Sequence, residues 1–133
     1  MSAKILIVED EMLVAMELEA ILDDLGHCAV GIAADLTGAE VYRDQSIDLA
    51  LVDLNLRDGL TGPEIGRRLC ARGVSVLFIT ANPRQLGDGV AGTIGVIEKP
   101  TDEMTVRAAV DYALGVRHGN CRIDPPTMLK FFG

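Results

Sequence analysis

The chain has 133 residues, which is the length of one ordinary domain. Its apolar fraction is 49% and its aromatic fraction only 4%, with no Trp, so the core must be built from aliphatic side chains. The net charge of −8 argues against nucleic acid as a partner, because binding to a phosphate backbone needs clustered Lys and Arg. We therefore expect one domain with an aliphatic core and no direct contact with nucleic acid.

Neither the cysteines nor the first residues indicate export or membrane insertion. Cys28, Cys70 and Cys121 are odd in number and far apart, with no His at metal-binding spacing, which is typical of idle thiols in a reducing compartment. The opening stretch MSAKILIVEDE has one Lys, four apolar residues and then acids, unlike a signal peptide or a membrane span. We expect a cytoplasmic protein that does not contact a membrane.

Strand-like and helix-like segments alternate along the chain. Short apolar runs predict strands at residues 5–8, 28–34, 47–54, 74–80 and 94–99. Helical spacing of apolar residues, with capping residues, predicts helices at 14–25, 37–44, 63–73 and from 101 onward. A further helix is expected between the last two strands, but residues 81–95 contain one Pro and four Gly. We expect this fourth helix to be short, frayed or absent.

Five strands that alternate with helices imply right-handed crossovers and a parallel sheet covered on both faces. The third strand fits this arrangement, because Leu49 and Leu51 face one side and Ala50 and Val52 face the other. The predicted fold class is α/β: a doubly wound, five-stranded parallel sheet in the flavodoxin-like order 2-1-3-4-5, with helices on both faces.

Polar residues stand where these strands end. The first strand ends in Glu9 and Asp10, the third in Asp53, the fourth in Thr80 and the fifth in Lys99. Ligands of open α/β sheets bind beyond the carboxyl ends of the strands, where the strand order reverses, so these side chains should converge there. Mg²⁺ held by the carboxylates and by a backbone carbonyl just past Asp53 would relieve their repulsion. An aspartate in such a place can itself be the nucleophile of a phosphoryl transfer.

These residues resemble a known family, the receiver domains of two-component response regulators. The resemblance covers roughly residues 4 to 115 and rests on four features in the right order. They are the stretch ILIVEDE, the stretch LALVDLNLRDGLTGPEIGRRL, Thr80 followed by a small residue, and a Lys-Pro pair at residue 99.

The resemblance implies roles for the residues around the third strand. Asp53 would be the phosphoacceptor, Asp10 the main acidic Mg²⁺ ligand with Glu9 beside it, and Asn55 the donor of a backbone carbonyl to the metal. The side chain of Asn55 would also tune the rate at which the phosphoryl group is lost.

The resemblance also implies roles for residues after the fourth and fifth strands. Thr80, followed by the small Ala81, would be the switch hydroxyl, and the side chain of Asn82 would be a second tuner of phosphoryl loss. Lys99 would bind the phosphoryl group, aimed by a cis bond to Pro100.

Two features depart from the usual family pattern. Val96 stands where most receivers carry an aromatic switch residue, and the stretch FITANP followed by a Gly-rich segment partly matches a divergent receiver subgroup named for a Phe-Ala-Thr-Gly motif. We hypothesise that the readout is an ordering of residues 82–95 around Thr80, in place of an aromatic rotamer change.

The predicted protein is a stand-alone response regulator, with a receiver domain at residues 1–117 and a tail at 118–133 that is no output domain. It would take a phosphoryl group from a sensor histidine kinase or a phosphotransfer protein onto Asp53 and catalyse only its own phosphorylation and dephosphorylation. The signal would leave through contact with an unidentified protein target or through phosphate drainage. The expected contact surface is the first helix with the loops around the site, and a second face is expected near the fourth and fifth strands.

Three other classes are open at this point. An interaction module that is never phosphorylated should have lost the acceptor, the acids or the Lys, and none is lost here. An aspartyl-phosphate phosphohydrolase would need an acid two residues after Asp53, where the chain has Asn55. A flavin or nucleotide carrier would need a Gly-rich loop after the first strand.

The tail has two readings. It either docks on the domain or frays, or it forms a partner or homodimer contact through Phe131 and Phe132, because exposed aromatic side chains favour association.

Overall fold

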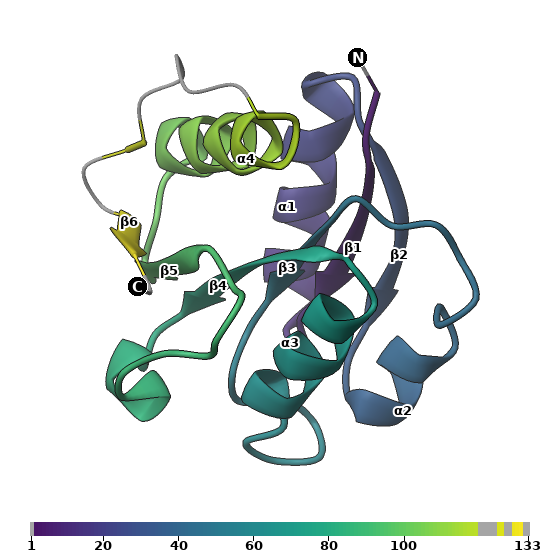
Figure 1. Ribbon diagram of the computed structural model, residues 1–133, viewed down its shortest axis with the longest axis vertical. Helices are drawn as coiled ribbons and strands as arrows, with labels where there is room; N and C mark the ends of the chain where they lie inside the picture. Colours follow the sequence, from purple (N-terminus) through teal and green to yellow (C-terminus); the bar gives the residue numbers. More distant parts are fainter. Residues whose placement is uncertain (1, 120–124, 127–128, 132–133) are drawn as a thin grey trace.

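A six-stranded sheet forms the middle layer of the molecule (Figure 1). The computed structural model describes residues 2–119, 125–126 and 129–131, so Cys121 and Phe132 lie outside the described residues. The sheet order is β2-β1-β3-β4-β5-β6, in which the first five strands are parallel, as predicted, and the last is antiparallel. The bounds are β1 Lys4–Val8, β2 Cys28–Ala33, β3 Leu49–Val52, β4 Ser75–Thr80, β5 Gly95–Glu98 and β6 Leu129–Phe131.

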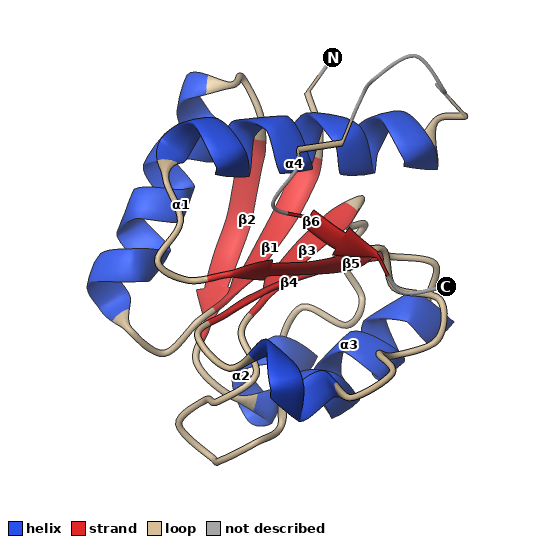
Figure 2. Ribbon diagram, turned by 90° about the vertical axis from the view of Figure 1, so that its left-hand side faces the viewer, coloured by secondary structure: helices blue, strands red, loops and turns tan. Residues whose placement is uncertain are grey.

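Helices cover both faces of the sheet, which confirms the predicted doubly wound α/β architecture (Figure 2). Their bounds are α1 Met12–Asp24, α2 Leu36–Glu40, α3 Gly62–Ala71 and α4 Glu103–Arg117. α1 and α4 pack on one face, where Leu49 and Leu51 point, and α2 and α3 pack on the other, where Ala50 and Val52 point. The alternation of the third strand therefore serves two separate aliphatic cores.

α2 is shorter than the predicted helix over residues 37–44. It begins earlier because the Asp35 carboxylate accepts a hydrogen bond from the Gly38 N–H at 2.7 Å and caps the first turn. After the helix the Tyr42 N–H bonds to the Ala39 carbonyl, and the following residues continue as turns with the same i→i−3 spacing. The helix predicted at 37–44 is therefore α-helical only as far as Glu40, and its later hydrogen bonds are too tight for an α-helix.

The expected short fourth helix is a single 3-10 turn, η1, at Pro83–Leu86, the unlabelled turn that follows β4 in Figure 1. It is anchored by Leu86, whose side chain is buried in the core that also holds Phe78 and Val96. Turns and bends then lead to β5, as the glycines of this segment predict.

The prediction of a five-stranded sheet was incomplete, because β6 from the tail covers the outer edge of β5. Gly95 makes this approach possible: a Cβ on Gly95 would lie 2.2 Å from the Lys130 carbonyl oxygen. Leu129 is buried against the α1–α4 core. The Phe131 ring packs edge to face on Tyr112 of α4, with the two ring centroids 5.6 Å apart. Residues 129–131 fit the reading in which the tail docks on the domain.

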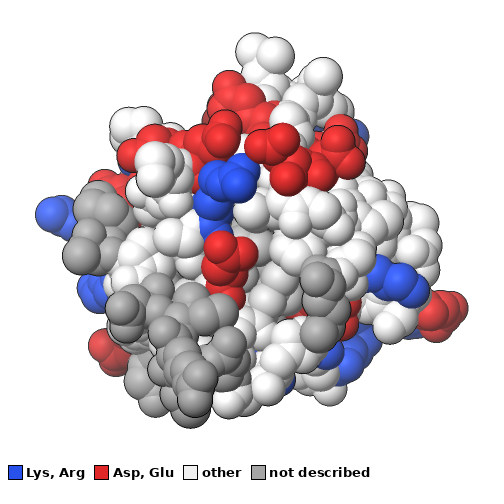
Figure 3. All heavy atoms as spheres, turned by 90° about the horizontal axis from the view of Figure 1, so that it is seen from above, with Lys and Arg blue, Asp and Glu red and all other residues white. Residues whose placement is uncertain are grey.

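The surface is acidic, in keeping with the net charge. Figure 3 shows Asp and Glu side chains gathered along one side of the face that it displays, with basic side chains more scattered. An ion pair also links two helices on one face of the sheet, because Arg107 of α4 lies 3.1 Å from Asp24 of α1. Among the described residues, no helix is long and apolar enough to span a membrane.

Candidate functional site

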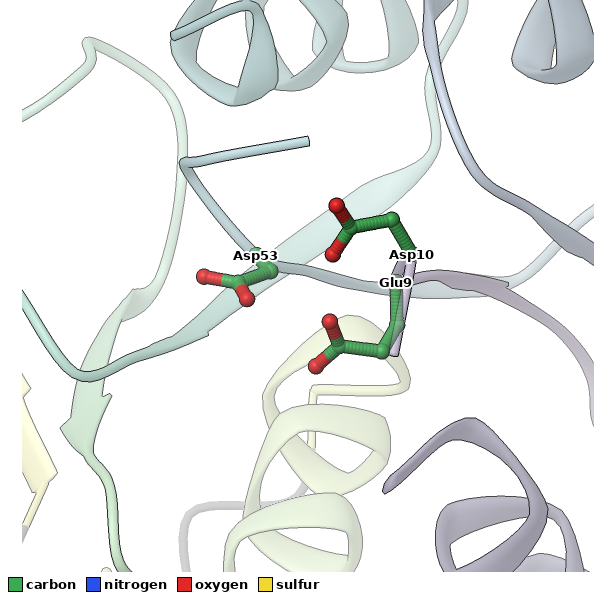
Figure 4. A group of neighbouring side chains, drawn as sticks. All are labelled: Glu9, Asp10 and Asp53. Atoms are coloured by element: carbon green, nitrogen blue, oxygen red, sulfur yellow. The ribbon is translucent and has the colours of Figure 1, made fainter. Parts of the chain in front are cut away.

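Three carboxylates meet at the carboxyl ends of β1 and β3. The two strands are paired in register, with Val8 beside Val52, and the Asp53 N–H donates to the Val8 carbonyl at 2.9 Å. This pairing brings the residues that follow the strands to one place. One carboxylate oxygen of each of Glu9, Asp10 and Asp53 lies within 4.8 Å of the other two, and Figure 4 shows the Glu9 and Asp10 carboxylates pointing toward the side on which Asp53 lies.

Glu9 is the most buried of the three acids, with 2% of its surface exposed. One of its oxygens accepts a hydrogen bond from Lys99 Nζ, and the other accepts one from the Glu11 N–H at 3.2 Å. Burial raises the pKa of Glu9 to about 7; the charge of Asp53 adds to this shift, and the bond to Lys99 opposes it. Sequence reasoning gave Glu9 a secondary role, whereas the structure makes it the main partner of the lysine.

Lys99 lies between two of the carboxylates. Its backbone N–H donates to the Thr80 carbonyl at 2.8 Å, which fixes the residue just past the end of β5. Its Nζ bonds to Glu9 and, at 3.0 Å, to Asp53 Oδ2. Burial works against the ammonium, but the bonds to the two carboxylates outweigh burial and raise the pKa of Lys99 above its usual value. The bond from Lys99 to Pro100 is cis.

Asp53 is held on both carboxylate oxygens and is only 8% exposed. Oδ1 accepts a hydrogen bond from the Leu54 N–H at 2.7 Å, and Oδ2 accepts the bond from Lys99. The first turn of α3 lies directly against this segment, because a Cβ on Gly62 would be 2.1 Å from the Asp53 carbonyl oxygen. Sequence analysis missed Gly62; its position immediately before Pro63, at the start of a helix, was the only signal.

The residues after β4 form a second side of the site. Thr80 is fully buried, and its Oγ1 accepts a hydrogen bond from the Asn82 N–H at 3.1 Å. Ala81 and Asn82 are exposed. Val96 does not join this group, because it is 3% exposed and packs in the α2–α3 core.

Asn55 lies on the exposed rim of the site, two residues after Asp53. Its Nδ2 donates a hydrogen bond to Oε1 of Gln85 in η1 at 2.8 Å. Sequence analysis did not single out Gln85, since nothing in the pattern of a Gly-rich loop predicts which of its side chains turns back toward a strand end.

The cluster is chemically suited to a divalent cation. Its ligand atoms are all carboxylate oxygens, the donors that Mg²⁺ prefers, and three acids face a single ammonium. Asp10 is exposed while Glu9 and Asp53 are buried, so the cluster is open on one side. A cation with several retained waters would fit such a half-open arrangement.

A further pocket adjoins the site. A groove of about 780 Å³ runs between α1 and the segment from Lys99 to Val106, and Ile79 and Ala81 also line it. Its rim carries acidic residues of α1 and α4, among them Glu17 and Glu103.

Comparison with known proteins agrees with this geometry. The family of response regulator receiver domains matches residues 5–111. The phyllosphere-induced regulator PhyR of Methylorubrum extorquens is 37% identical over 118 residues, which cover 86% of this chain and 44% of PhyR. The chain therefore spans less than half the length of this curated relative.

Solved structures give the same result. The solution structure of the PhyR response regulator REC domain from Erythrobacter litoralis has a TM-score of 0.77 and 35% identity, with 95% of each chain covered. The crystal structure of anti-anti-sigma factor PhyR from Bartonella quintana has a TM-score of 0.73 and 30% identity, covering 90% of this chain and 50% of that one. The chain belongs to the family of response regulator receiver domains.

Proposed function

We propose that this chain is a phosphoacceptor response regulator, which receives a phosphoryl group on Asp53 from the phosphohistidine of a sensor histidine kinase or a phosphotransfer protein. The single observation that carries the proposal is the setting of Asp53. It is a buried carboxylate at a strand end, bonded to the Leu54 N–H and Lys99, with two further acids within 4.8 Å.

The chemistry follows from these contacts. An oxygen of Asp53 attacks phosphorus, a new P–O bond forms, and the P–N bond to the donor imidazole breaks, so that the imidazole leaves with the bonding electron pair. Lys99 and the Thr80 hydroxyl donate hydrogen bonds to the negatively charged phosphoryl oxygens as the phosphoryl group is transferred to Asp53. Water later cleaves the acyl phosphate and returns the carboxylate.

Mg²⁺ would be held by Asp10 and Asp53, with Glu9 beside it and the backbone carbonyl of Asn55 as a further ligand. Bound there, the ion would neutralise carboxylate and phosphoryl charge during transfer. The chain's own contribution is to hold two acids buried and ready, with Lys99 as the counter-charge until the ion and the phosphoryl group arrive.

We propose α1 and the groove beside it as the docking surface for the phosphoryl donor. α1 carries three large apolar side chains that are at least half exposed, and Met104 at the start of α4 is 79% exposed; those of α1 are Met12, Leu13 and Met16. The groove reaches Lys99, so a partner seated there would have direct access to the site.

The relatives support a signalling role for the output. Proteins named PhyR include an anti-anti-sigma factor, and this chain matches about half of such a protein. We propose a cytoplasmic regulator with a receiver domain at residues 1–117 and a tail at 118–133, which acts through protein contact or by draining phosphoryl groups from a shared donor.

Binding of a phosphoryl mimic tests the proposal without the kinase. Beryllium fluoride with Mg²⁺ should saturate the wild-type protein and shift the backbone NMR signals of Leu54, Thr80 and Lys99. Asp53→Asn should give no such shifts at the same concentrations, because it lacks the carboxylate to which the mimic attaches. If the wild type also gave none, an unphosphorylated interaction module would be the better assignment.

A further inference from the structure

A side-chain hydrogen bond joins the two segments that border the site. Asn55 Nδ2 donates to Gln85 Oε1 at 2.8 Å, across 30 positions of sequence. Asn55 belongs to the loop that follows Asp53, and Gln85 belongs to η1, which follows β4. The bond therefore connects the loop after the acceptor strand to the segment expected to change on phosphorylation.

η1 is also tied to the buried hydroxyl of the site. The Asn82 N–H donates to Thr80 Oγ1 at 3.1 Å, and the Gln85 N–H donates to the Asn82 carbonyl at 3.1 Å. Together with the bond to Asn55, these contacts form a continuous path that starts at Thr80 and ends two residues from Asp53. Gln85 is the link in this path between η1 and the Asn55 loop.

Apart from the buried Leu86, the segment from Gln85 to Gly89 is held by local turn hydrogen bonds. Leu86 is buried, but Gly87 and Gly89 both adopt positive φ angles, of 56° and 98°. Their N–H groups bond only to the local carbonyls of Arg84 and Leu86. A short 3-10 turn with glycines after it is easily displaced, so a contact from its exposed side to the site has a large effect on its position.

We propose that Gln85 is a positioning residue of the phosphoryl site, which holds η1 and the Asn55 loop together so that η1 responds to changes at both Thr80 and Asp53. This inference rests on the proposed phosphoacceptor function. A bond between two neutral amides suits the task, because its small net free energy can hold the two segments together without making either of them rigid.

The same contact should slow the loss of the phosphoryl group. Gln85 accepts a hydrogen bond from the amide of Asn55, which ties η1 to the exposed loop two residues after Asp53. Without the bond, both segments are free to move apart, and water reaches Asp53 more readily. Gln85 would thus affect the lifetime of the phosphorylated protein while touching neither the metal nor the phosphoryl group.

Four variants of the full chain separate this role from a general structural one. Gln85→Ala and Asn55→Ala each remove the bond, whereas Gln85→Glu keeps an oxygen that accepts from Asn55. Arg84→Ala is the matched control, because Arg84 is an exposed neighbour in the same turn whose side chain is not part of the bond.

Amide hydrogen exchange of the unphosphorylated protein is the first measurement. Gln85→Ala and Asn55→Ala should each speed exchange at Gln85, Gly87 and Gly89 by about three- to tenfold, the factor expected for one lost hydrogen bond. A fifth variant, which combines Gln85→Ala with Asn55→Ala, should show no faster exchange than either single variant, because the two substitutions remove the same bond. Gln85→Glu and Arg84→Ala should stay near the wild type. Equal exchange in Gln85→Ala and Arg84→Ala would overturn the proposal.

The lifetime of the phosphoryl group is the second measurement, made by intact mass after acetyl phosphate is removed. Gln85→Ala should lose the group about three to ten times faster than Arg84→Ala, and Gln85→Glu should restore a lifetime near that of the wild type. Normal loading with equal lifetimes in all variants would overturn the Gln85 proposal alone. A wild type that takes up no phosphoryl group would instead contradict the proposed function, and the lifetime could then not be measured in any variant.

Discussion

Lys99 is the residue that balances the charge of the site. Its ammonium bonds to both buried acids, Glu9 and Asp53, and its own side chain is 15% exposed. An ion pair at this depth contributes less by attraction than by preventing two carboxylates from being buried without a counter-charge. The same arrangement leaves the acids ready for a cation, because one ammonium cannot neutralise three carboxylates.

Removal of Lys99 should therefore destabilise the protein in a way that Mg²⁺ reverses. Lys99→Met should lower the free energy of unfolding by about 2 to 4 kcal/mol in EDTA at pH 8, because it leaves two buried carboxylates unpaired. Added Mg²⁺ should recover more stability in this variant than in the wild type. Urea denaturation with and without MgCl₂ measures both effects. Lys4→Met is the control, since Lys4 lies exposed on β1. If Lys99→Met lowered the free energy of unfolding no more than Lys4→Met does, this role of Lys99 would be contradicted.

Glu9 should make the metal-free protein less stable as the pH rises. Its folded-state pKa of about 7 lies above the ordinary value of 4.5, so the folded state binds more protons than the unfolded state between these values. The free energy of unfolding should fall by about 1 to 3 kcal/mol as the pH rises from 4.5 to 7, and this dependence should be complete above pH 7.

Glu9→Gln is the test of that pH dependence. This variant should remove most of the fall in stability between pH 5 and pH 7.5, measured by urea denaturation in EDTA. If the free energy of unfolding changed with pH equally in the wild type and in Glu9→Gln over this range, Glu9 would not be the source of the pH dependence.

At the scale of elements, the tail strand is the feature that departs furthest from the expected fold. β6 contributes three residues and pairs with β5 through Gly95, Val96 and Ile97. β6 covers the edge of β5 and is itself only three residues long, and such a short edge strand offers little surface on which other strands could add.

Gly95→Ala should displace β6 while leaving the rest of the sheet in place. The added Cβ would collide with the Lys130 carbonyl, so amide exchange at residues 129–131 should rise strongly and stability should fall by about 1 to 2 kcal/mol. Lys130→Ala changes an exposed side chain on the same strand and should alter neither. Protection of β6 that is unchanged in Gly95→Ala would mean that the strand does not depend on this close approach.

The elements show why some predictions succeeded and others were incomplete. Strands and helices with long apolar patterns, such as β3 and α4, were predicted because burial on one or two faces imposes a period on the sequence. The first turn of α4 is capped by the Asp102 carboxylate, which accepts a hydrogen bond from the Thr105 N–H at 2.7 Å. β6 was missed because three residues at the end of a Pro-containing tail carry no period, and its pairing is decided by a glycine 34 positions earlier.

Some residues of the site were likewise predicted from the sequence and others were not. The convergence of Glu9, Asp10, Asp53 and Lys99 was predicted because the carboxyl ends of parallel strands meet at one edge of a sheet. Gln85 was not predicted, because its contact depends on the path of an irregular loop. The roles of these residues in phosphoryl transfer stay predictions that follow from the family.

On the scale of the whole molecule, the fold brings three carboxylates, an ammonium and a buried hydroxyl to one edge of the sheet, beside a groove lined in part by α1. The acids come from β1 and β3, the hydroxyl from β4 and the ammonium from the residue after β5, so no single element holds the site. Under the proposed function, a phosphoryl group on Asp53 would lie where several strands end, and hydrogen bonds already link η1 to Asn55 and to Thr80.

The most direct test of this account is the intact mass of the protein after incubation with acetyl phosphate. The wild type should gain one phosphoryl group in the presence of Mg²⁺ and none in EDTA, and Asp53→Asn should gain none in either condition. An adduct that persists in Asp53→Asn, or that forms equally well without the metal, would contradict the assignment of Asp53 as the phosphoacceptor.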